Sequence, residues 1–454
     1  WQVCPFELCL DLAIWVDAVI CDYNYVFDPT AHLKRFFGEG SSGKGSYIFL
    51  IDEAHNLVER GREMYSASLY KEDLLEVRKL VKAEDPKLAK GLSECNQQFL
   101  ELKRECEHYQ ILKSVSHIAL KLMNVLSKLE DYLEECKDAE KKKRVLDFYF
   151  AVRSFLNIHD IMDENYVIFS EMMEDGRFQI KLFCVNPAVN LQNYLEQGNS
   201  TIFFSATLLP VHYYKKLLSV EKDDYAVYAH SSFPQENKFL FIGTDVSTRY
   251  TRRGESTYQR FARYIAVMAE QKKGNYMAFF PSYRFLEEVH TCFLECVDHE
   301  VDSICQVSYM DEEQREEFLE EFEQEREKSL VAFCVMGGIF SEGIDLTDDK
   351  LIGAVIAGTG LPQVCTEREI LKQYFNAADM DGFDYAYLYP GMNKVLQSAG
   401  RVIRTESDRG VILLLDDRFR AMRYREVFPR EWQQYQLGSV KNLEQEIRTF
   451  WESP

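Results

Sequence analysis

One stretch of nine residues decides the fold class: YIFLIDEAH, residues 47–55. Its first five residues are apolar or aromatic without alternation, a pattern that favours a buried strand of a parallel sheet. Two carboxylates, Asp52 and Glu53, follow where this strand would end. Because α/β sheets bind ligands at the carboxyl ends of their parallel strands, the stretch predicts an α/β fold with a chemical site at residues 52–55.

Further apolar runs predict strands along the rest of the chain: residues 17–22, 166–169, 201–204, 276–280, 330–335, 351–357 and 411–415. Charged segments of helical character lie between the runs of the second half. Strands and helices that alternate on this scale predict βαβ units around parallel sheets. We therefore predict two α/β domains, with a boundary near residues 232–234.

A long segment between these strands has a different character. Residues 92–175 contain neither Gly nor Pro and are rich in Leu, Glu and Lys, with apolar residues at helical intervals. Long helices are the structure that this composition favours. We predict a helical insertion at residues 66–164 inside a first α/β domain, whose remainder is residues 1–65 and 165–232. The second α/β domain is residues 233–454.

Composition limits the class of protein. Hydrophobic residues make up 46% of the 454 residues, and no run of eighteen apolar residues occurs, which excludes a membrane-spanning helix. The twelve cysteines are scattered without a Cys-x-x-Cys pair, so we expect reduced thiols in a cytoplasmic protein. The net charge of −21 disfavours a broad nucleic-acid-binding surface, although a local basic groove for a single strand is compatible with it.

The carboxylates at residues 52–55 suit phosphoryl transfer. Transfer to water needs an acidic residue at the Mg²⁺ ion and another group that orients or deprotonates the water. Asp52 and Glu53 supply both, at the start of a predicted helix. The alternative is an ordinary helix N-terminus with an aspartate as its cap.

Three later motifs also stand at predicted strand ends or helix starts: Ser-Ala-Thr at 205–207, Ser-Glu-Gly-Ile-Asp at 341–345 and QSAGRVIR at 397–404. Arg401 and Arg404 are three residues apart, which predicts one helix face from which both guanidiniums reach developing phosphate charge. The alternatives are an ordinary turn for Ser-Ala-Thr and a surface helix with two solvated arginines for QSAGRVIR.

A glycine-rich segment imitates a phosphate-binding loop. GEGSSGKG at residues 38–45 nearly fits the P-loop pattern, but Gly45 replaces the Ser or Thr that would meet Mg²⁺. The glycines also precede a predicted strand, whereas a P-loop follows one. We therefore predict a flexible loop, and the sequence contains no other P-loop candidate.

The order of the motifs is more specific than any one of them. Asp-Glu-Ala-His, Ser-Ala-Thr, Ser-Glu-Gly-Ile-Asp and Gln-x-x-Gly-Arg-x-x-Arg resemble, in succession, motifs II, III, V and VI of superfamily-two helicases. Four further phrases are similar to the XPD/DinG-type iron–sulfur DNA helicases: CPFE at 4–7, DYNY at 22–25, FFPSY at 279–283 and LDDRF at 415–419. The resemblance covers nearly the whole chain, with the helical insertion as its least specific part.

This resemblance implies two RecA-like motor domains, the first incomplete, and a helical arch-like insertion. It implies an ATP-dependent DNA helicase that couples hydrolysis to 5′-to-3′ translocation on single-stranded DNA, acts on forked or duplex DNA, and serves DNA repair or replication. The family's P-loop lies upstream of its iron–sulfur segment, so we expect that the sequence starts mid-protein and that the 454-residue chain alone hydrolyses ATP negligibly.

The resemblance also implies roles for residues at the first strand end and beyond. Asp52 would hold Mg²⁺ and Glu53 would activate the attacking water, while His55 would couple nucleotide state to domain closure. Ser205 and Thr207 would link the ATP site to the DNA track.

In the second half, Arg401 and Arg404 would approach the γ-phosphate, with Gly343 and Asp345 nearby, and Gln397 would share the coupling role of His55. In the N-terminal segment, Cys4 would be the last of four ligands to a [4Fe–4S] cluster, and the expected cofactors are therefore ATP, Mg²⁺ and this cluster.

Two other functions compete with this interpretation. One is a non-catalytic DNA-binding or scaffold remnant of such a helicase, although the presence of Glu53, Arg401 and Arg404 argues against decay of the site. The other is an RNA helicase of the related Asp-Glu-Ala-His group, which the phrases around Cys4 and Ser282 disfavour.

Overall fold

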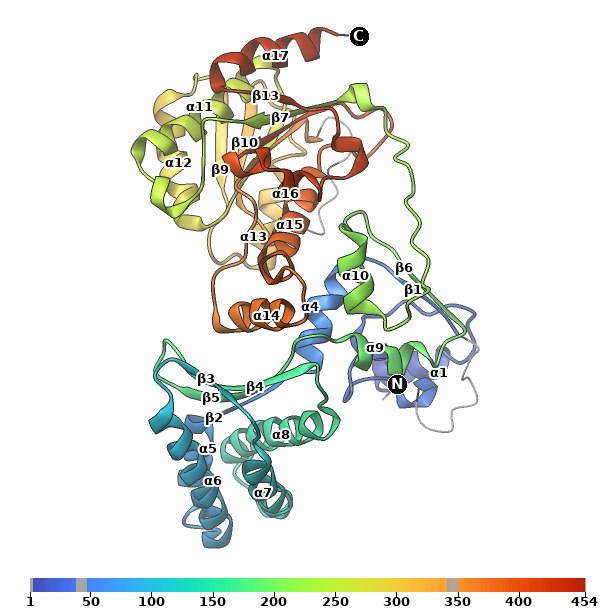
Figure 1. The fold of residues 1–454 in the computed structure, drawn as a ribbon, viewed down its shortest axis with the longest axis vertical. Coiled ribbons are helices and arrows are strands. Elements are labelled where there is room, and N and C mark those ends of the chain that lie inside the picture. The colour runs from blue at the N-terminus through green and yellow to red at the C-terminus, as the bar shows by residue number, and fades with distance from the viewer. Residues whose placement is uncertain (1–2, 38–46, 341–345, 347–349, 454) are drawn as a thin grey trace. The chain divides into compact units, whose positions relative to one another are not determined.

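The computed structural model describes residues 3–37, 47–340, 346 and 350–453, which form two compact units. Unit 1 contains Trp1–Ser205 and Tyr214–Lys222, and unit 2 contains Ala206–Tyr213 and Asp223–Pro454. Figure 1 shows both, and each is described by itself. The glycine-rich segment at 38–45 and the motif at 341–345, with Gly343 and Asp345, lie outside the described residues.

Unit 2 is built on a seven-stranded sheet in the order β13-β7-β12-β11-β8-β10-β9, and every neighbouring pair is parallel. Its strands are β7 (Lys238–Gly243), β8 (Asn275–Phe280), β9 (Val301–Cys305), β10 (Ser329–Val335), β11 (Gly353–Ala357), β12 (Gly410–Leu415) and β13 (Gln436–Gly438). The predicted α/β class with a parallel sheet is therefore confirmed, and β7, β9 and β13 are strands that the sequence did not predict.

Helices cover the sheet of unit 2 because its central strands are apolar on both faces. The core of one face joins the sheet to α11 (Glu255–Gln271), α12 (Tyr283–Cys296) and α17 (Val440–Glu452) (Figure 1). The remaining α-helices of the unit are α13 (Glu312–Glu320), α14 (Thr366–Ala377), α15 (Tyr389–Ala399) and α16 (Met422–Arg425).

Unit 1 has two parts, and the first is a two-stranded parallel sheet of β1 (Ile48–Ile51) and β6 (Ser200–Phe203). The helices around it are α1 (Pro5–Leu12), α2 (Asn24–Phe27), α3 (Lys34–Phe37), α4 (His55–Met64), α9 (Ala188–Leu195) and α10 (Val211–Leu218), the last shared with unit 2. The strand predicted at 17–22 is wrong: this segment is irregular and largely exposed, because an apolar run becomes a strand only where another strand pairs with it.

The second part of unit 1 is a lobe of four helices and an antiparallel sheet in the order β2-β5-β4-β3. The helices are α5 (Lys71–Val81), α6 (Pro86–Glu105), α7 (Ser116–Glu135) and α8 (Ala139–Ile161), and they share one core with the sheet. The strands are β2 (Ala67–Tyr70), β3 (Tyr109–Leu112), β4 (Tyr166–Met172) and β5 (Phe178–Cys184).

The sheet of this lobe differs from the sequence prediction in one respect. The run at 166–169 was predicted as a strand of the α/β domain that resumes at 165, but β4 pairs antiparallel with β5 and β3 of the lobe. The strands that enter and leave the lobe, β2 and β5, pair with each other, so the sheet extends to Cys184. In the part of the chain that the structure describes, no helix is long and apolar enough to cross a membrane.

Candidate active site

The pairing of β1 with β6 brings two sequence motifs to one sheet edge. Ile51 lies opposite Phe203, so both strands end together. Backbone hydrogen bonds continue beyond the strands, from the Phe204 N–H to the Ile51 carbonyl at 3.0 Å and from the Ala54 N–H to the Phe204 carbonyl at 3.2 Å. The Asp-Glu-Ala-His turn and Ser205 are therefore held against each other by main-chain contacts.

Three side chains from these motifs form a connected group. The Ser205 hydroxyl donates a hydrogen bond to Glu53 Oε2 at 3.1 Å, and His55 Nδ1 lies 2.7 Å from Ser205 Oγ and 3.3 Å from the same Glu53 oxygen. Because the serine proton is directed at the carboxylate, His55 Nδ1 is the donor to Ser205. The imidazole is buried, whereas the Glu53 side chain is 60% exposed. His55 and Ser205 thus fix one carboxylate oxygen of Glu53 and leave the group open to a water molecule, which is the geometry that a general base requires.

The backbone of Glu53 adopts an uncommon conformation. Its φ angle is +45°, in the left-handed region that costs a residue other than glycine about 1–3 kcal/mol. The Tyr23 hydroxyl supports this turn, because it hydrogen-bonds the carbonyl oxygen of Asp52 and lies 3.0 Å from that of Glu53. Apart from its place in the DYNY motif at 22–25, no sequence pattern predicts this role for Tyr23.

Asp52 is exposed beside this group. Its Oδ1 accepts the Glu53 N–H at 2.7 Å, and among the described residues Oδ2 has no hydrogen bond. Mg²⁺ is commonly held by one or two carboxylates together with phosphate oxygens and water. Asp52 therefore fits a Mg²⁺ ion that substrate phosphates would help to bind, and no cluster of three or more potential metal ligands is present in the described ranges.

The arginine motif of unit 2 has a different local structure from the predicted one. Helix α15 ends at Ala399, so Arg401 and Arg404 follow it in a loop and do not share a helix face. The carboxylate of Asp408 accepts the N–H groups of Arg404 at 2.7 Å and Thr405 at 2.8 Å. In a continuing helix the Arg404 N–H would bond the Gly400 carbonyl, so its hydrogen bond to Asp408 keeps Arg404 in the loop.

The loop held by Asp408 contains both guanidinium groups in half-buried positions, and Gln397 is half-buried on the last turn of α15. Asp408 itself is buried and also accepts the Thr405 hydroxyl at 2.5 Å. Sequence reasoning missed this aspartate, because a carboxylate in a polar stretch gives no signal of burial.

The two polar residues of the Ser-Ala-Thr motif fall in different units: Ser205 belongs to unit 1, whereas Thr207 belongs to unit 2 and is buried.

A second aspartate anchors the end of β12. Asp416 is fully buried, accepts the Thr248 N–H and hydroxyl at 2.8 Å each, and forms an ion pair with Arg418 at 2.7 Å. Burial alone would raise the pKa of Asp416, but the hydrogen bonds and charge of Arg418 outweigh it and hold this pKa below its ordinary value. These contacts give the LDDRF motif at 415–419 a structural role, because they anchor the end of β12 to Thr248.

Comparisons with known proteins match both halves of the chain. A family model described as "Helicase C-terminal domain" matches residues 265–435, and a second, DEAD_2, matches residues 1–74. The ATP-dependent DNA helicase XPD of Sulfolobus acidocaldarius is 24% identical over 432 residues, which cover 93% of this chain and 73% of that protein. The ATP-dependent DNA helicase CHL1 of Candida albicans is 23% identical over 493 residues, covering 92% and 58%.

This chain belongs to the XPD/CHL1 family of superfamily-two helicases. A solved structure of apo XPD has the same fold, with a TM-score of 0.61 at 20% identity over 95% of this chain and 84% of the other. The chain spans about three quarters of the length of the XPD relative and little more than half of the CHL1 relative.

The resemblance to XPD/DinG-type iron–sulfur DNA helicases predicts Cys4 as a cluster ligand. Cys4 is exposed and stands at the N-terminal cap of α1, whose residue Cys9 is exposed too. An exposed thiol at a helix start has room to bind iron, but no group of three or more potential ligands is found among the described residues. Cys4 thus has the chemistry and the exposure of a thiolate ligand, without a preformed cluster site in the described segments.

Proposed function

We propose that this chain is part of the motor of an ATP-dependent DNA helicase that moves 5′ to 3′ along single-stranded DNA during repair or replication. The observation that carries the proposal is the group of Glu53, His55 and Ser205, in which a carboxylate is fixed by a buried histidine and a half-buried serine at the end of a parallel strand. Relatives named ATP-dependent DNA helicases support the same reaction.

Each candidate residue then has a definite chemical task. The Glu53 carboxylate takes a proton from the attacking water, and Asp52 holds Mg²⁺ against the phosphates. Arg401 and Arg404 neutralise charge that develops on the γ-phosphoryl group. His55, Ser205 and Gln397 act as positioning residues, and Gly343, Asp345 and Thr207 complete the family's motifs.

The reaction also needs an element that holds the triphosphate. A P-loop normally supplies backbone amides and a lysine for the β- and γ-phosphates, and the sequence contains no complete P-loop pattern. We therefore expect negligible hydrolysis from the 454-residue chain alone, measured as steady-state ATPase with single-stranded DNA present. Turnover near the ~10 per second that is common for enzymes would contradict this expectation.

The role of Glu53 is tested in a protein that includes the P-loop. Glu53→Gln keeps the size and the contact with Ser205 but cannot take up a proton, so hydrolysis should fall about 100- to 10,000-fold while ATP binding stays nearly unchanged. Glu63→Gln, on the exposed side of α4, is the matched control and should hydrolyse ATP normally. Normal turnover in Glu53→Gln would show that another group is the base.

The role of Cys4 is tested by iron content, independently of activity. We propose that Cys4 is the last thiolate ligand of a [4Fe–4S] cluster, because such a cluster needs four soft ligands and Cys4 occupies the position of the family's final one. In a protein that holds the cluster, Cys4→Ser should lose bound iron and the brown colour, whereas Cys9→Ser should retain both. Full iron in Cys4→Ser would rule out the assignment.

A further inference from the structure

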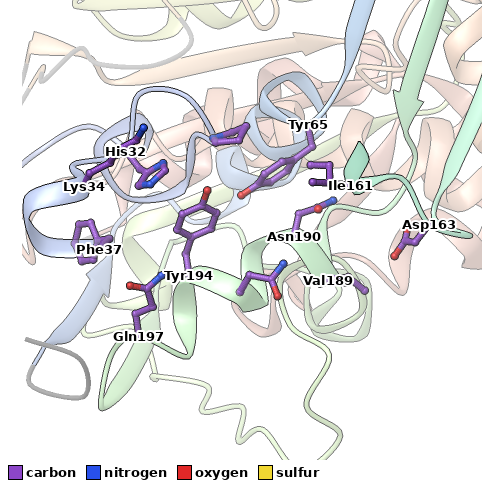
Figure 2. A pocket seen from close by; sticks show the side chains of 12 residues that line it. His32, Lys34, Phe37, Tyr65, Ile161, Asp163, Val189, Asn190, Tyr194 and Gln197 are labelled. Atoms are coloured by element: carbon purple, nitrogen blue, oxygen red, sulfur yellow. The ribbon is translucent and has the colours of Figure 1, made fainter. Parts of the chain in front are cut away.

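A cavity of about 640 Å³ opens on unit 1, away from the residues of the candidate active site. It is bounded by the loop that contains α3, by Tyr65 at the end of α4, by the segment after α8, and by α9 with the turn that follows it (Figure 2). Sites for small ligands commonly enclose about 300–1,000 Å³. The cavity therefore has the volume of a ligand site, and its walls come from segments more than 100 residues apart in the sequence.

Aromatic rings form much of its wall. Tyr65 is buried and its hydroxyl donates to the Phe27 carbonyl at 2.5 Å, so its ring is fixed. His32 meets the ring of Tyr194 edge to face, with 5.3 Å between the ring centres, and Phe37 lines the same space. Figure 2 shows Tyr65 and Tyr194 directed toward one another across the cavity.

The loop side of the cavity is held in place before any ligand binds. The Asp28 carboxylate accepts the N–H groups of Thr30 at 2.7 Å and Ala31 at 2.9 Å. His32 Nδ1 lies 2.8 Å from the Asp28 carbonyl, so in the neutral ring Nδ1 carries the hydrogen and Nε2 is an acceptor. Burial and then the charge of Asp28 raise the pKa of Tyr194 to about 12, which keeps its hydroxyl protonated as a donor.

The opposite side, α9 and its following turn, contributes three carboxamides: Asn190, Asn193 and Gln197. A carboxamide carries donors and an acceptor side by side, the pattern that pairs with the edges of nucleobases. Among the described residues, neither Asn193 nor Gln197 has a side-chain hydrogen bond, so both groups are available.

Charge at the rim favours one negative group. Lys34 lines the cavity, is exposed, and has no ion pair within the described part of the chain. Asp163, across from it, accepts the Asn165 N–H at 2.9 Å and the Asn165 amide at 2.8 Å; both donors are neutral, so this carboxylate keeps its charge and directs a negative group toward Lys34. One available cation suits a single phosphate, not a polyanion.

We propose that this cavity binds one unstacked nucleotide, with the base against the aromatic wall and the amides, and the phosphate at Lys34. Proteins bind single strands through aromatic rings that stack bases and cations that follow the backbone. The inference rests on the proposed function, because it takes the single DNA strand as the source of the nucleotide, and it adds a base-binding site to that function. A free nucleotide has the same chemistry, and the experiment separates the two sources.

The experiment uses photocrosslinking with the full chain. A single-stranded oligodeoxythymidylate that carries one 5-iodouracil is irradiated with the protein, and the crosslinked peptides are identified by mass spectrometry. We expect crosslinks at His32, Phe37 or Tyr194, because iodouracil reacts with the aromatic ring on which it lies. Asn193→Ala combined with Gln197→Ala should lower the yield roughly tenfold, whereas Gln192→Ala, on α9 but outside the cavity, should leave it unchanged.

A second pair of variants tests the phosphate contact. Lys34→Ala should reduce the slope of log affinity against log salt by roughly 0.7, the contribution of one phosphate contact on a single strand. Lys90→Ala, an exposed lysine on α6, should leave this slope unchanged. Because Lys34 and Asn193 are exposed, unchanged circular dichroism is expected for both and confirms that the variants fold.

Thymidine monophosphate as a competitor distinguishes the sources of the nucleotide. Competition only at concentrations far above those of the oligonucleotide supports the DNA strand, and competition at equal concentration supports a free nucleotide in the same cavity. Crosslinks outside the cavity, or an unchanged yield in the double variant, would overturn the proposal. Crosslinking does not require ATP. The cavity proposal can therefore be contradicted while Glu53→Gln behaves as proposed, and the proposed role of Glu53 can be contradicted while the crosslinks appear as expected.

Discussion

The two parallel sheets of this protein are built from similar sequence but are buried to very different degrees. In unit 2 every residue of β11 and β12 is buried. In unit 1 the two strands leave apolar side chains exposed: Ile48 is 63% exposed, Leu50 is 66% exposed and Ile202 is 53% exposed. A run of apolar residues therefore predicts a strand, but it does not predict whether other elements cover that strand.

The difference bears on where each sheet obtains its stability. Parallel sheets are normally covered on both faces, and a sheet of two strands is marginal without such cover. In unit 2 a packed core covers the sheet, and the buried ion pair of Asp416 and Arg418 lies at the end of β12. At the sheet of unit 1 we expect a larger share to come from the turn at residues 52–55, with its backbone hydrogen bonds and the contacts of Glu53.

The largest effect expected in unit 2 concerns its buried ion pair. Asp416→Ala leaves the Arg418 guanidinium and the Thr248 hydroxyl without their acceptor, and breaking a buried pair in this way costs about 3–5 kcal/mol. Hydrogen exchange in peptides of β7 and β12 measures the loss. Asp417→Ala, whose carboxylate is less deeply buried and pairs with Arg252, is the control and should cost less than about 1 kcal/mol.

The same pair makes the stability of unit 2 depend on pH in a definite direction. The pKa of Asp416 is lowered in the folded state, so its contribution is fully present above the unfolded-state pKa and is lost as pH falls through the folded pKa. Acid titration should therefore show the difference between wild type and Asp416→Asn shrinking below about pH 4. A difference that grew toward low pH would contradict the assigned direction.

A matched pair of leucines tests the contrast between the sheets directly. Leu413→Ala removes a fully buried side chain from β12 and should cost about 2–5 kcal/mol. Leu50→Ala removes an exposed side chain from β1 and should cost about 0.5 kcal/mol or less. Local hydrogen exchange reports both. Equal losses would mean that the exposed face of β1 is covered in solution.

The smallest effect concerns the strained turn. Glu53→Gly and Glu53→Ala both remove the carboxylate, but glycine accepts a positive φ more readily, so the Gly variant should be more stable than the Ala variant by about 1 kcal/mol. At Glu59, inside α4, the order should reverse, with Gly about 1 kcal/mol less stable than Ala. The same order at both positions would show that the turn at Glu53 is not strained in solution.

Local sequence and elementary physical chemistry determined the parallel α/β class, several of its strands, and the position of Asp52 and Glu53 at a strand end. These features follow from apolar runs and from the turn residues next to them. Family resemblance added the expectation that His55 and Ser205 belong to the same site. The distance of 2.7 Å between these two side chains, 150 residues apart in sequence, could not be read from either segment.

Tertiary structure decided what local patterns leave open. It ended α15 at Ala399 and held Arg404 in the loop that follows, because Asp408 takes the backbone N–H groups of Arg404 and Thr405. It left residues 17–22 without strand structure and paired β4 with the antiparallel sheet of the lobe, because a strand forms only where hydrogen-bonding partners are present. Pairing, burial and the cavity beside Tyr194 depend on segments distant in sequence, and a local pattern holds no information about its partners.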